Sequence, residues 1–276
     1  MDLPTIGVLH DVTLLVCFAS VFGVVAFKML RPASELCSTG QVDARSFIGA
    51  DVLVVGAVAI MLLAGLSEVT PPAVPDKALE MTVNAGLAGI VVQLGLCTLL
   101  LVYLNVIRGL NLADLFGLRK LSLPKVLLLG VAFILPTFPC VAGAVYGMQA
   151  WMQDFWPDMS NQDTVEAFRA CKDPLAKALL VVSAAIVAPL VEETIFRGFF
   201  YGVMKRYTDG YFAAICTSLL FAVVHLHIGT LMPLMVLALI LCAVYEFTGS
   251  LLVPMVMHGL FNGTSLAVML LFPDMK

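Results

Sequence analysis

The sequence predicts an all-α membrane protein that crosses the bilayer several times. Of its 276 residues, 61% are hydrophobic and only 12% are charged, and the mean hydropathy is +1.02. A soluble domain carries roughly 25% charged residues, so the surplus apolar surface requires lipid as its solvent. The apolar runs reach about 20 residues, the length at which a helix crosses the hydrocarbon core. Helices satisfy their own backbone hydrogen bonds in lipid, which makes them the expected spanning element.

We expect about eight transmembrane helices that form a single membrane domain over residues 1–276. A stretch over 109–123 is amphipathic but too short to span, and it is expected to form an interfacial helix. The apolar runs that predict the eight spans are 8–30, 47–66, 82–107, 125–148, 174–206, 211–228, 230–247 and 251–272.

Charge and cysteine content exclude several classes of function. The net charge is −4 and no Lys/Arg cluster offsets it, which argues against nucleic acid as a partner. The seven cysteines form no Cys-x-x-Cys pair and most fall in apolar runs, so we expect no disulfide framework. The expected location is an integral, multi-pass position in a membrane, which is the cell membrane if the source is prokaryotic. The sequence does not indicate an oligomeric state.

Polar side chains inside the apolar runs gather in the C-terminal half of the chain. A charged side chain near the bilayer centre costs several kcal/mol, so such residues usually pair with one another and mark a functional site. A structural polar knot between helices is the alternative interpretation. The residues are Glu192, Glu193, Arg197, His225, His227, His258 and Asn262.

Helical spacing indicates which of these side chains can act together. Glu193 and Arg197 are four residues apart and can form an ion pair on one helix face. Glu192 points about 100° away from that face, so it is the carboxylate left free for chemistry. His258 and Asn262 are also four apart and share one face of the last span.

A proline and four glycines shape the same helices. Pro189 lies one turn before the two carboxylates and is expected to kink its helix, because it lacks the backbone N–H. The pairs Gly198/Gly202 and Gly259/Gly263 have the spacing at which neighbouring helices approach closely.

Several other residues have simpler interpretations. His227 follows His225 by two positions, so on a helix it would point to nearly the opposite side, and we expect an interfacial histidine unless the helix has already ended. Asp51 and Glu246 are isolated in the sequence and are expected at the membrane interface. Phe221 is expected to serve packing.

Three short motifs follow one another in the C-terminal half. They are EETIFR (Glu192–Arg197), FAVVH (Phe221–His225) and HGLFN (His258–Asn262), which fit Glu-Glu-x-x-x-Arg, Phe-x-x-x-His and His-x-x-x-Asn. In order and spacing they resemble the CPBP (ABI) family of intramembrane proteases. That family includes type II CAAX prenyl proteases and proteins of bacteriocin processing or self-immunity. The resemblance covers about residues 174–266, which would form the catalytic core.

The resemblance implies a fold, a reaction and a set of site residues. The implied fold has eight transmembrane helices around a conical polar cavity, and the implied reaction is hydrolysis of a peptide bond. The site residues carried over by the motifs are Glu192, Glu193, Arg197, His225, His258 and Asn262.

The resemblance also implies a role for each residue. Glu192, with His225, would activate a water molecule. His258 and Asn262 would stabilise the oxyanion of the tetrahedral intermediate, a contribution typically worth about a hundredfold or more in rate for each donor. The two remaining residues would support the site through their ion pair.

The metal requirement has two alternatives. A metal-free glutamate mechanism fits the residues without further ligands, so no cofactor is expected. The other alternative is a zinc site formed by Glu192, His225 and His258, which are ligand types that zinc accepts. The chain contains no His-Glu-x-x-His motif.

The sequence thus predicts an intramembrane endopeptidase that acts on a membrane-associated protein or peptide, for which a prenylated CAAX-type protein is one class. Two other functions stay open. A proton-coupled secondary transporter would use the Glu/His cluster as a relay, although no inverted repeat is visible. A non-catalytic membrane scaffold or immunity protein would retain its full phenotype when the motifs are mutated.

Overall fold

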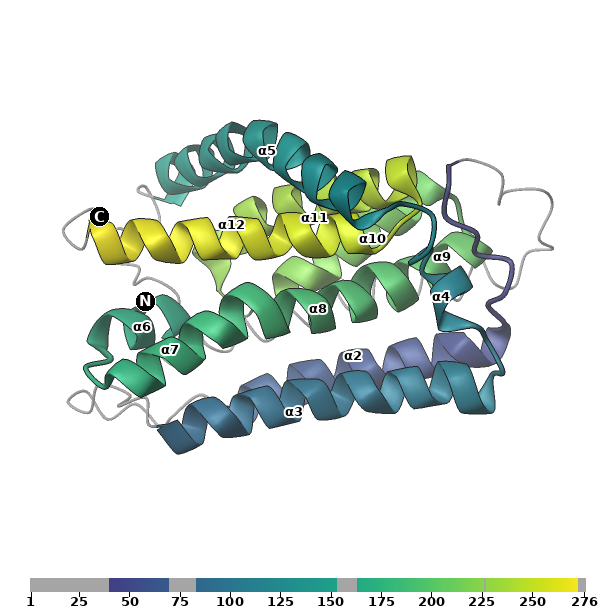
Figure 1. Cartoon of the computed structure of the whole chain (residues 1–276), viewed down its shortest axis with the longest axis horizontal. Coiled ribbons are helices and arrows are strands. Elements are labelled where there is room, and N and C mark those ends of the chain that lie inside the picture. Colours follow the sequence, from purple (N-terminus) through teal and green to yellow (C-terminus); the bar gives the residue numbers. More distant parts are fainter. Residues whose placement is uncertain (1–39, 70–82, 153–162, 226, 273–276) are drawn as a thin grey trace.

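The computed structural model describes residues 40–69, 83–152, 163–225 and 227–272, and every regular element in these ranges is helical (Figure 1). The prediction of an all-α fold is therefore confirmed. Outside the segment 174–207, the helices are α2 (Gly49–Val69), α3 (Val83–Val102) with its π-helical extension η1 (Tyr103–Ile107), α4 (Leu112–Leu115), α5 (Leu123–Met152), α6 (Asp163–Ala170), α10 (Gly210–Val223), α11 (Ile228–Thr248) and α12 (Leu252–Leu271).

The segment from Pro174 to Tyr207 is a continuous helical rod that alternates between α-helical and π-helical geometry. Asp173 caps its start by accepting hydrogen bonds from the N–H groups of Leu175 and Ala176 at 2.8 and 3.3 Å. Because π-helical turns inside α-helices are frequent at functional sites, the alternation favours a functional site in the middle of the rod. Its pieces are α7 (Pro174–Val182), η2 (Ser183–Val187), α8 (Ala188–Glu193), η3 (Thr194–Tyr201) and α9 (Gly202–Tyr207).

Pro189 explains the first π-helical piece. In a regular α-helix the N–H at position 189 would bond to the carbonyl of Ala185, and proline has no N–H to donate. The chain widens into η2 just before Pro189, and the N–H of Ala188 bonds to the carbonyl of Ser183 instead. The predicted local disruption therefore takes the form of a π-helical turn.

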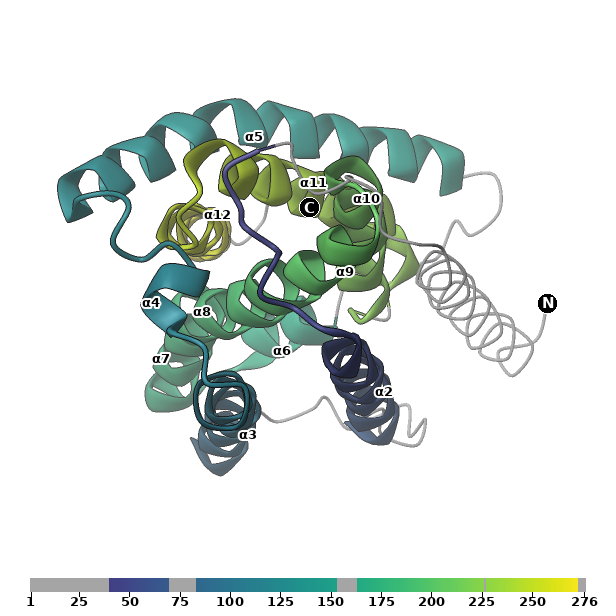
Figure 2. The same cartoon turned by 90° about the vertical axis from the view of Figure 1, so that its right-hand side faces the viewer.

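The rod lies at the centre of the bundle. Figure 1 shows α2 and α3 along one side of the rod and α12 with α5 along the other, and Figure 2 shows the same arrangement from the end. On the second side α12 packs against η2 and α8, while α11 packs against both α10 and α5. Helices from the last two fifths of the chain therefore surround the carboxylates of the rod.

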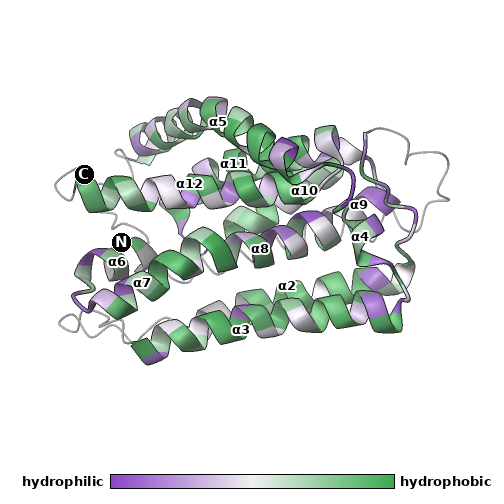
Figure 3. Cartoon of the chain, viewed as in Figure 1, coloured by the Kyte–Doolittle hydropathy of each residue, from purple (hydrophilic) through white to green (hydrophobic). Residues whose placement is uncertain are grey.

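The chain is an integral, multi-pass membrane protein. Figure 3 shows hydrophobic residues along most of the long helices, with hydrophilic ones near α4 and α9 at one end and near α6 and the start of α7 at the other. Among the described residues, five helices are long and apolar enough to cross a membrane, whereas the apolar parts of α2 (Gly49–Leu62) and α10 are shorter. The predicted span 8–30 lies outside the described residues, so the count of eight stays a prediction. The five helices are Val83–Ile107, Leu123–Met152, Pro174–Tyr207, Ile228–Thr248 and Leu252–Leu271.

Asp51 is not isolated, so that part of the expectation was wrong, whereas its position at the membrane interface stays a prediction. Its side chain is fully buried at the start of α2 and accepts hydrogen bonds from the hydroxyl of Tyr103 at 2.6 Å and from Nε of Arg108 at 2.9 Å. It also accepts the N–H of Ile48 at 2.7 Å. The bond to Asp51 raises the pKa of the Arg108 guanidinium. The carboxylate therefore ties α2 to the end of α3 and η1.

Glu246 is not isolated either. Near the end of α11 it accepts hydrogen bonds from the hydroxyl of Tyr201 at 2.5 Å and from the buried ammonium of Lys205, which also donates to the carbonyl of Val42 at 2.9 Å. The N–H of Gln41 bonds to the backbone carbonyl of Glu246 at 3.0 Å. These contacts hold the segment 41–47 across the ends of α9 and α11, as Figure 2 shows.

Before α5 begins at Leu123, the stretch 109–123 is helical only over the four residues of α4. Asn111 caps α4 through its side-chain oxygen, and the chain then turns so that Phe116 is buried. The carbonyl of Phe116 accepts the N–H of Leu251 at 3.0 Å, just before α12. The segment therefore packs partly against the protein, and its position in the membrane interface stays a prediction.

The two glycine pairs do permit close approach, although in different ways. A Cβ at Gly198 or Gly202 would meet the rings of Phe116 or Phe47 at 2.8 and 2.3 Å, so side chains occupy that space. A Cβ at Gly259 would instead lie 2.8 Å from the backbone carbonyl oxygen of Ala185, the carbonyl that Pro189 leaves without its helical donor. Of these four glycines, Gly259 is the one that faces the backbone of another helix.

We predict that Gly259→Ala destabilises the protein by about 1–3 kcal/mol, because the added methyl group overpacks a contact with backbone that cannot move aside. The matched control is Gly263→Ala, whose Cβ would make an ordinary contact at 3.7 Å with the Cβ of Ala185. Thermal unfolding of the purified chains in detergent measures both. Equal stability of the two variants would contradict the close contact between α12 and η2.

Candidate active site

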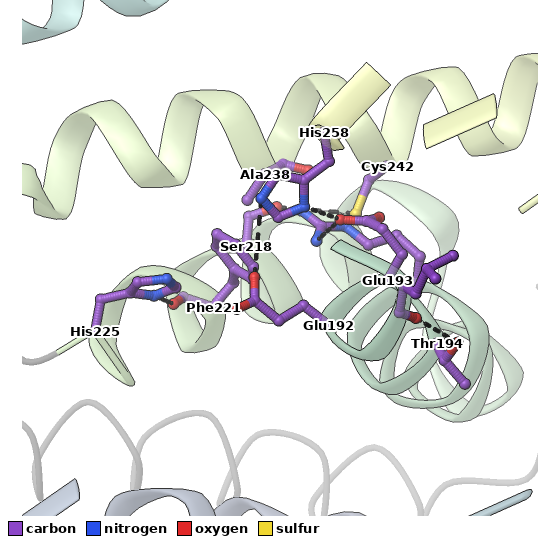
Figure 4. Close-up of polar contacts among 11 residues, drawn as sticks. Glu192, Glu193, Thr194, Ser218, Phe221, His225, Ala238, Cys242 and His258 are labelled. Carbon is purple, nitrogen blue, oxygen red and sulfur yellow. Dashed lines mark hydrogen bonds and ion pairs between the residues drawn. The ribbon is translucent and has the colours of Figure 1, made fainter. Parts of the chain in front are cut away.

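The centre of the candidate site is the carboxylate of Glu193. Its Oε1 accepts one hydrogen bond from Nη1 of Arg197 and one from Nδ1 of His258, both at 2.8 Å (Figure 4). Glu193 and Arg197 are completely buried, and His258 is only 3% exposed. The predicted ion pair at i and i+4 is therefore present, and it includes a histidine from another helix.

Arg197 connects the carboxylate to further helices. Its Nη2 donates to the carbonyl of Ala238 in α11 at 3.1 Å, and its Cζ lies 4.7 Å from the ring centroid of Phe221 in α10. A guanidinium over an aromatic face is stabilised by the ring quadrupole. Because His258 lies on α12, the cluster joins the rod to α10, α11 and α12.

Two polar atoms of this cluster stay unpaired among the described residues. Oε2 of Glu193 and Nε of Arg197 are buried without a hydrogen-bond partner. Each such group costs about 1–3 kcal/mol. A fold tolerates this cost most readily where the polar groups serve a function, which agrees with the placement of a site here.

Glu192 occupies a different environment from its neighbour. Its side chain is 28% exposed, and its Oε2 lies 3.8 Å from Nε2 of His258. The expectation that the adjacent carboxylates face different directions agrees with this geometry. The two ring nitrogens of His258 thus face the two carboxylates, Nδ1 toward Glu193 and Nε2 toward Glu192.

His225 lies on the other side of Phe221. The α10 helix ends at Val223, and in the turn that follows Nδ1 of His225 bonds to the carbonyl of Phe221 at 2.7 Å. The ring centroid of Phe221 lies 4.8 Å from that of His225 and 5.9 Å from that of His258, so Phe221 contacts both imidazoles (Figure 4). The contact marked by the dashed line at the Glu192 carboxylate in Figure 4 is to Nε2 of His258, at 3.8 Å. The pairing of Glu192 with His225 stays a prediction.

Asn262 lies one turn beyond His258 on α12, and its side chain is tied to the rod. Its Nδ2 donates to the carbonyl of Ala184 in η2 at 2.9 Å. One of the two N–H donors of the amide that the resemblance assigns to an oxyanion is therefore bonded to backbone. Its role in stabilising an oxyanion stays a prediction.

The position of His227 follows from the early end of α10. The expectation that it points away from His225 assumed a continuing helix, but α10 ends at Val223 and His227 is the extended residue that precedes α11. Its φ of −130° and ψ of 111° are those of extended backbone. Helical geometry therefore does not determine the direction of its side chain.

The candidate zinc ligands do not form a metal site as placed. Within the described ranges, no three His, Cys, Asp or Glu side chains come close enough together to hold a metal ion. Nδ1 of His258 bonds to Glu193, Nδ1 of His225 bonds to Phe221, and Phe221 separates the two rings. The hydrogen bonds occupy only Nδ1 of each ring, so the choice between the zinc triad and the metal-free mechanism stays a prediction.

Some groups that contact the site residues could not be predicted from the sequence. The carbonyls of Ala238 and Ala184 receive the Arg197 and Asn262 side chains, but a backbone carbonyl has no sequence signal. Phe221 was expected to serve packing alone, and it also contacts a guanidinium and two imidazoles. The spacing of Phe221 and His225 by four residues was the available hint.

We predict that the two adjacent carboxylates differ sharply in their effect on stability. Glu193→Ala leaves the Arg197 guanidinium buried and unpaired, which costs about 3–5 kcal/mol. Glu192→Ala removes a partly exposed group and is expected to change the free energy of unfolding by less than about 1 kcal/mol. Unfolding in mixed detergent measures both, and similar losses in the two variants would contradict the assignment.

Comparisons with known proteins agree with the motifs. Residues 174–264 match the family model of type II CAAX prenyl endopeptidase Rce1-like proteins. The chain is 30% identical over 98 residues to a Bacillus subtilis (strain 168) protein named "Putative membrane peptidase YdiL", a match that covers 36% of this chain and 40% of that relative. No solved structure matches the chain. These matches support a CPBP/CAAX protease family for residues 174–264, the segment that carries the site.

Proposed function

We propose that this chain is an intramembrane endopeptidase that hydrolyses a peptide bond in a membrane-associated protein or peptide. The proposal is for a glutamate-type mechanism in which Glu192 activates the attacking water. The family assignment of residues 174–264 supports a peptidase, and the position of the site on membrane-spanning helices supports a substrate held in the bilayer.

One observation carries the proposal, namely that two neighbouring carboxylates have opposite environments. Glu193 is buried and its Oε1 is bonded to Arg197 and His258, so it serves to hold the helices together. Glu192 is partly exposed, and its Oε2 lies 3.8 Å from Nε2 of His258. When two titratable groups are placed in such different surroundings, one is typically available for proton transfer.

For this reaction the main requirement on Glu192 is that its carboxylate lie where it can reach a water molecule. A carboxylate within reach of a water molecule can take one of its protons while the oxygen attacks the peptide carbonyl carbon, a contribution of typically 10²–10⁴-fold in rate. The buried surroundings of Glu193, Arg197 and His258 hold these groups in one arrangement, which avoids reorganisation during the reaction.

The substrate class follows from the depth of the site. Glu192 lies in the middle of a 34-residue helical rod that is long enough to cross the membrane, so a scissile bond must reach it from within or beside the bilayer. A prenylated, CAAX-type protein has a lipid anchor that would bring its terminal segment to this depth. The description of the matching family model favours this class.

We predict that Glu192→Ala lowers cleavage at least about 10²-fold, because the general base is lost. Membranes from cells that carry the wild type or the variant are compared by labelling new protein N-termini, and the expected result is a set of termini seen only with the wild type.

The control for this comparison is Asp173→Asn, which replaces the cap of α7 with a residue that also caps well and lies outside the site. It should yield the wild-type termini. Undiminished cleavage by the Glu192 variant would overturn the mechanism. Absence of any cleavage by the wild type, together with proton-coupled flux in liposomes, would indicate a transporter instead.

A further inference from the structure

The π-helical turn before Pro189 leaves one backbone carbonyl without a helical donor. In η2 the N–H of Ala188 bonds to the carbonyl of Ser183, five residues back, instead of the carbonyl of Ala184, four residues back. In π-helical spacing the donor to Ala184 would be the N–H at position 189, which proline lacks. Neither helical spacing therefore supplies the carbonyl of Ala184 with a backbone N–H.

The side chain of Asn262 supplies the missing donor from α12. Its Nδ2 lies 2.9 Å from the carbonyl oxygen of Ala184. At membrane depth no water is at hand to bond a free carbonyl, so a donor from a neighbouring helix is a strong requirement. One turn before Asn262 on the same helix, Gly259 lies against the carbonyl of Ala185, which loses its donor in α-helical spacing. The α12 helix therefore packs on both carbonyls that lack a donor because position 189 is proline.

The bond to Ala184 fixes the direction of the Asn262 amide. A carboxamide has one end that only accepts and one NH₂ end with two N–H donors, and the two ends have nearly the same shape. Because a carbonyl accepts but cannot donate, Ala184 holds the NH₂ end against the rod, and the second N–H is then held in one direction. Asn262 is half-buried and lies one turn beyond His258, the residue of α12 that bonds to Glu193.

We propose that Pro189 is a positioning residue, which leaves the carbonyl of Ala184 free so that this carbonyl orients the side-chain amide of Asn262. The inference rests on the proposed peptidase function and deepens it, because the resemblance assigns that amide to the oxyanion. A donor that is already oriented lowers a barrier more than a mobile one, since it need not reorganise as charge develops. A missing N–H on the rod thus determines the direction of a donor on α12.

Pro189→Ala returns an N–H to position 189. In π-helical spacing this N–H reaches the carbonyl of Ala184, and in α-helical spacing the N–H of Ala188 reaches it. In both cases a backbone donor competes with Asn262. Alanine is the best helix former and proline the worst, so we expect the variant to fold.

The first test is NMR of the full chain with ¹⁵N-labelled asparagine side chains in detergent micelles. The Asn262 signals are assigned by their loss in Asn262→Ala. In the wild type we expect one of the two Nδ2 protons at the downfield position of a hydrogen-bonded proton, and in Pro189→Ala we expect it to move toward the position of a free amide. Two free-amide protons in the wild type, or unchanged signals in a folded Pro189→Ala variant, would overturn the proposal.

Two controls separate this effect from a general change of structure. Pro136→Ala replaces an exposed proline inside α5 and should leave the Asn262 signals unchanged. The side chain of Asn105 donates from Nδ2 to the carbonyl of Leu110 at 3.1 Å, so its signals should stay the same in every variant and report that the fold is intact. An equal shift of the Asn262 signals in both proline variants would also contradict the proposal.

A kinetic cycle tests the positioning role in the cleavage reaction. The rate at which the Glu192-dependent N-termini appear is compared for Pro189→Ala, Asn262→Ala and the double variant. We expect Pro189→Ala to slow cleavage about 10- to 100-fold, because misplacement of a reacting group by about 1 Å can cost about 10²-fold. The double variant should be no slower than Asn262→Ala alone. Losses that multiply in the double variant, or full activity of a folded Pro189→Ala variant, would show that Pro189 does not act through Asn262.

The two levels of the account fail separately. Cleavage that persists in Glu192→Ala would remove the proposed function and leave the NMR result for the amide unaffected. Cleavage that depends on Glu192, combined with an Asn262 amide that does not respond to Pro189→Ala, would leave the peptidase in place and remove only the role of Pro189.

Discussion

The structure depends on one buried carboxylate oxygen that accepts two charged or polar donors from different parts of the chain. Oε1 of Glu193 bonds to Arg197 on its own helix and to His258 on α12. A buried charge is tolerated only when it is paired and hydrogen-bonded, and breaking such a pair costs far more than forming it gains. The helices that carry Glu193, Arg197 and His258 must therefore stay together, and Glu192 is held beside them.

The backbone of the rod, as well as its side chains, determines how α12 packs against it. Pro189 removes a helical donor, η2 forms before it, and Gly259 brings α12 against the carbonyl of Ala185. One turn along α12 from Gly259, Asn262 bonds to the carbonyl of Ala184. Two backbone features thus position His258. They are Pro189, one turn before the carboxylates, and Gly259, which directly follows the histidine.

Local spacing predicted part of this arrangement. The Glu193–Arg197 pair and the different direction of Glu192 follow from helix geometry alone, and the three motifs indicated that their helices meet. The bond from His258 to Glu193 joins residues 65 positions apart and depends on tertiary packing. For the same reason Asp51 and Glu246 were interpreted as isolated, because their partners Arg108 and Lys205 lie 57 and 41 positions away. For His227 the exception applies, because α10 ends at Val223, before the end of the predicted span.

A double-mutant cycle between Glu193 and His258 tests the central contact most directly. The free energy of unfolding in mixed detergent is measured for Glu193→Ala, His258→Ala and the double variant, with Glu193→Ala and Asp51→Ala as the control pair that shares no contact. The account predicts a coupling energy of about 0.5–3 kcal/mol for the first pair and additivity for the second. Additive losses within about 0.5 kcal/mol for Glu193 and His258 would contradict it.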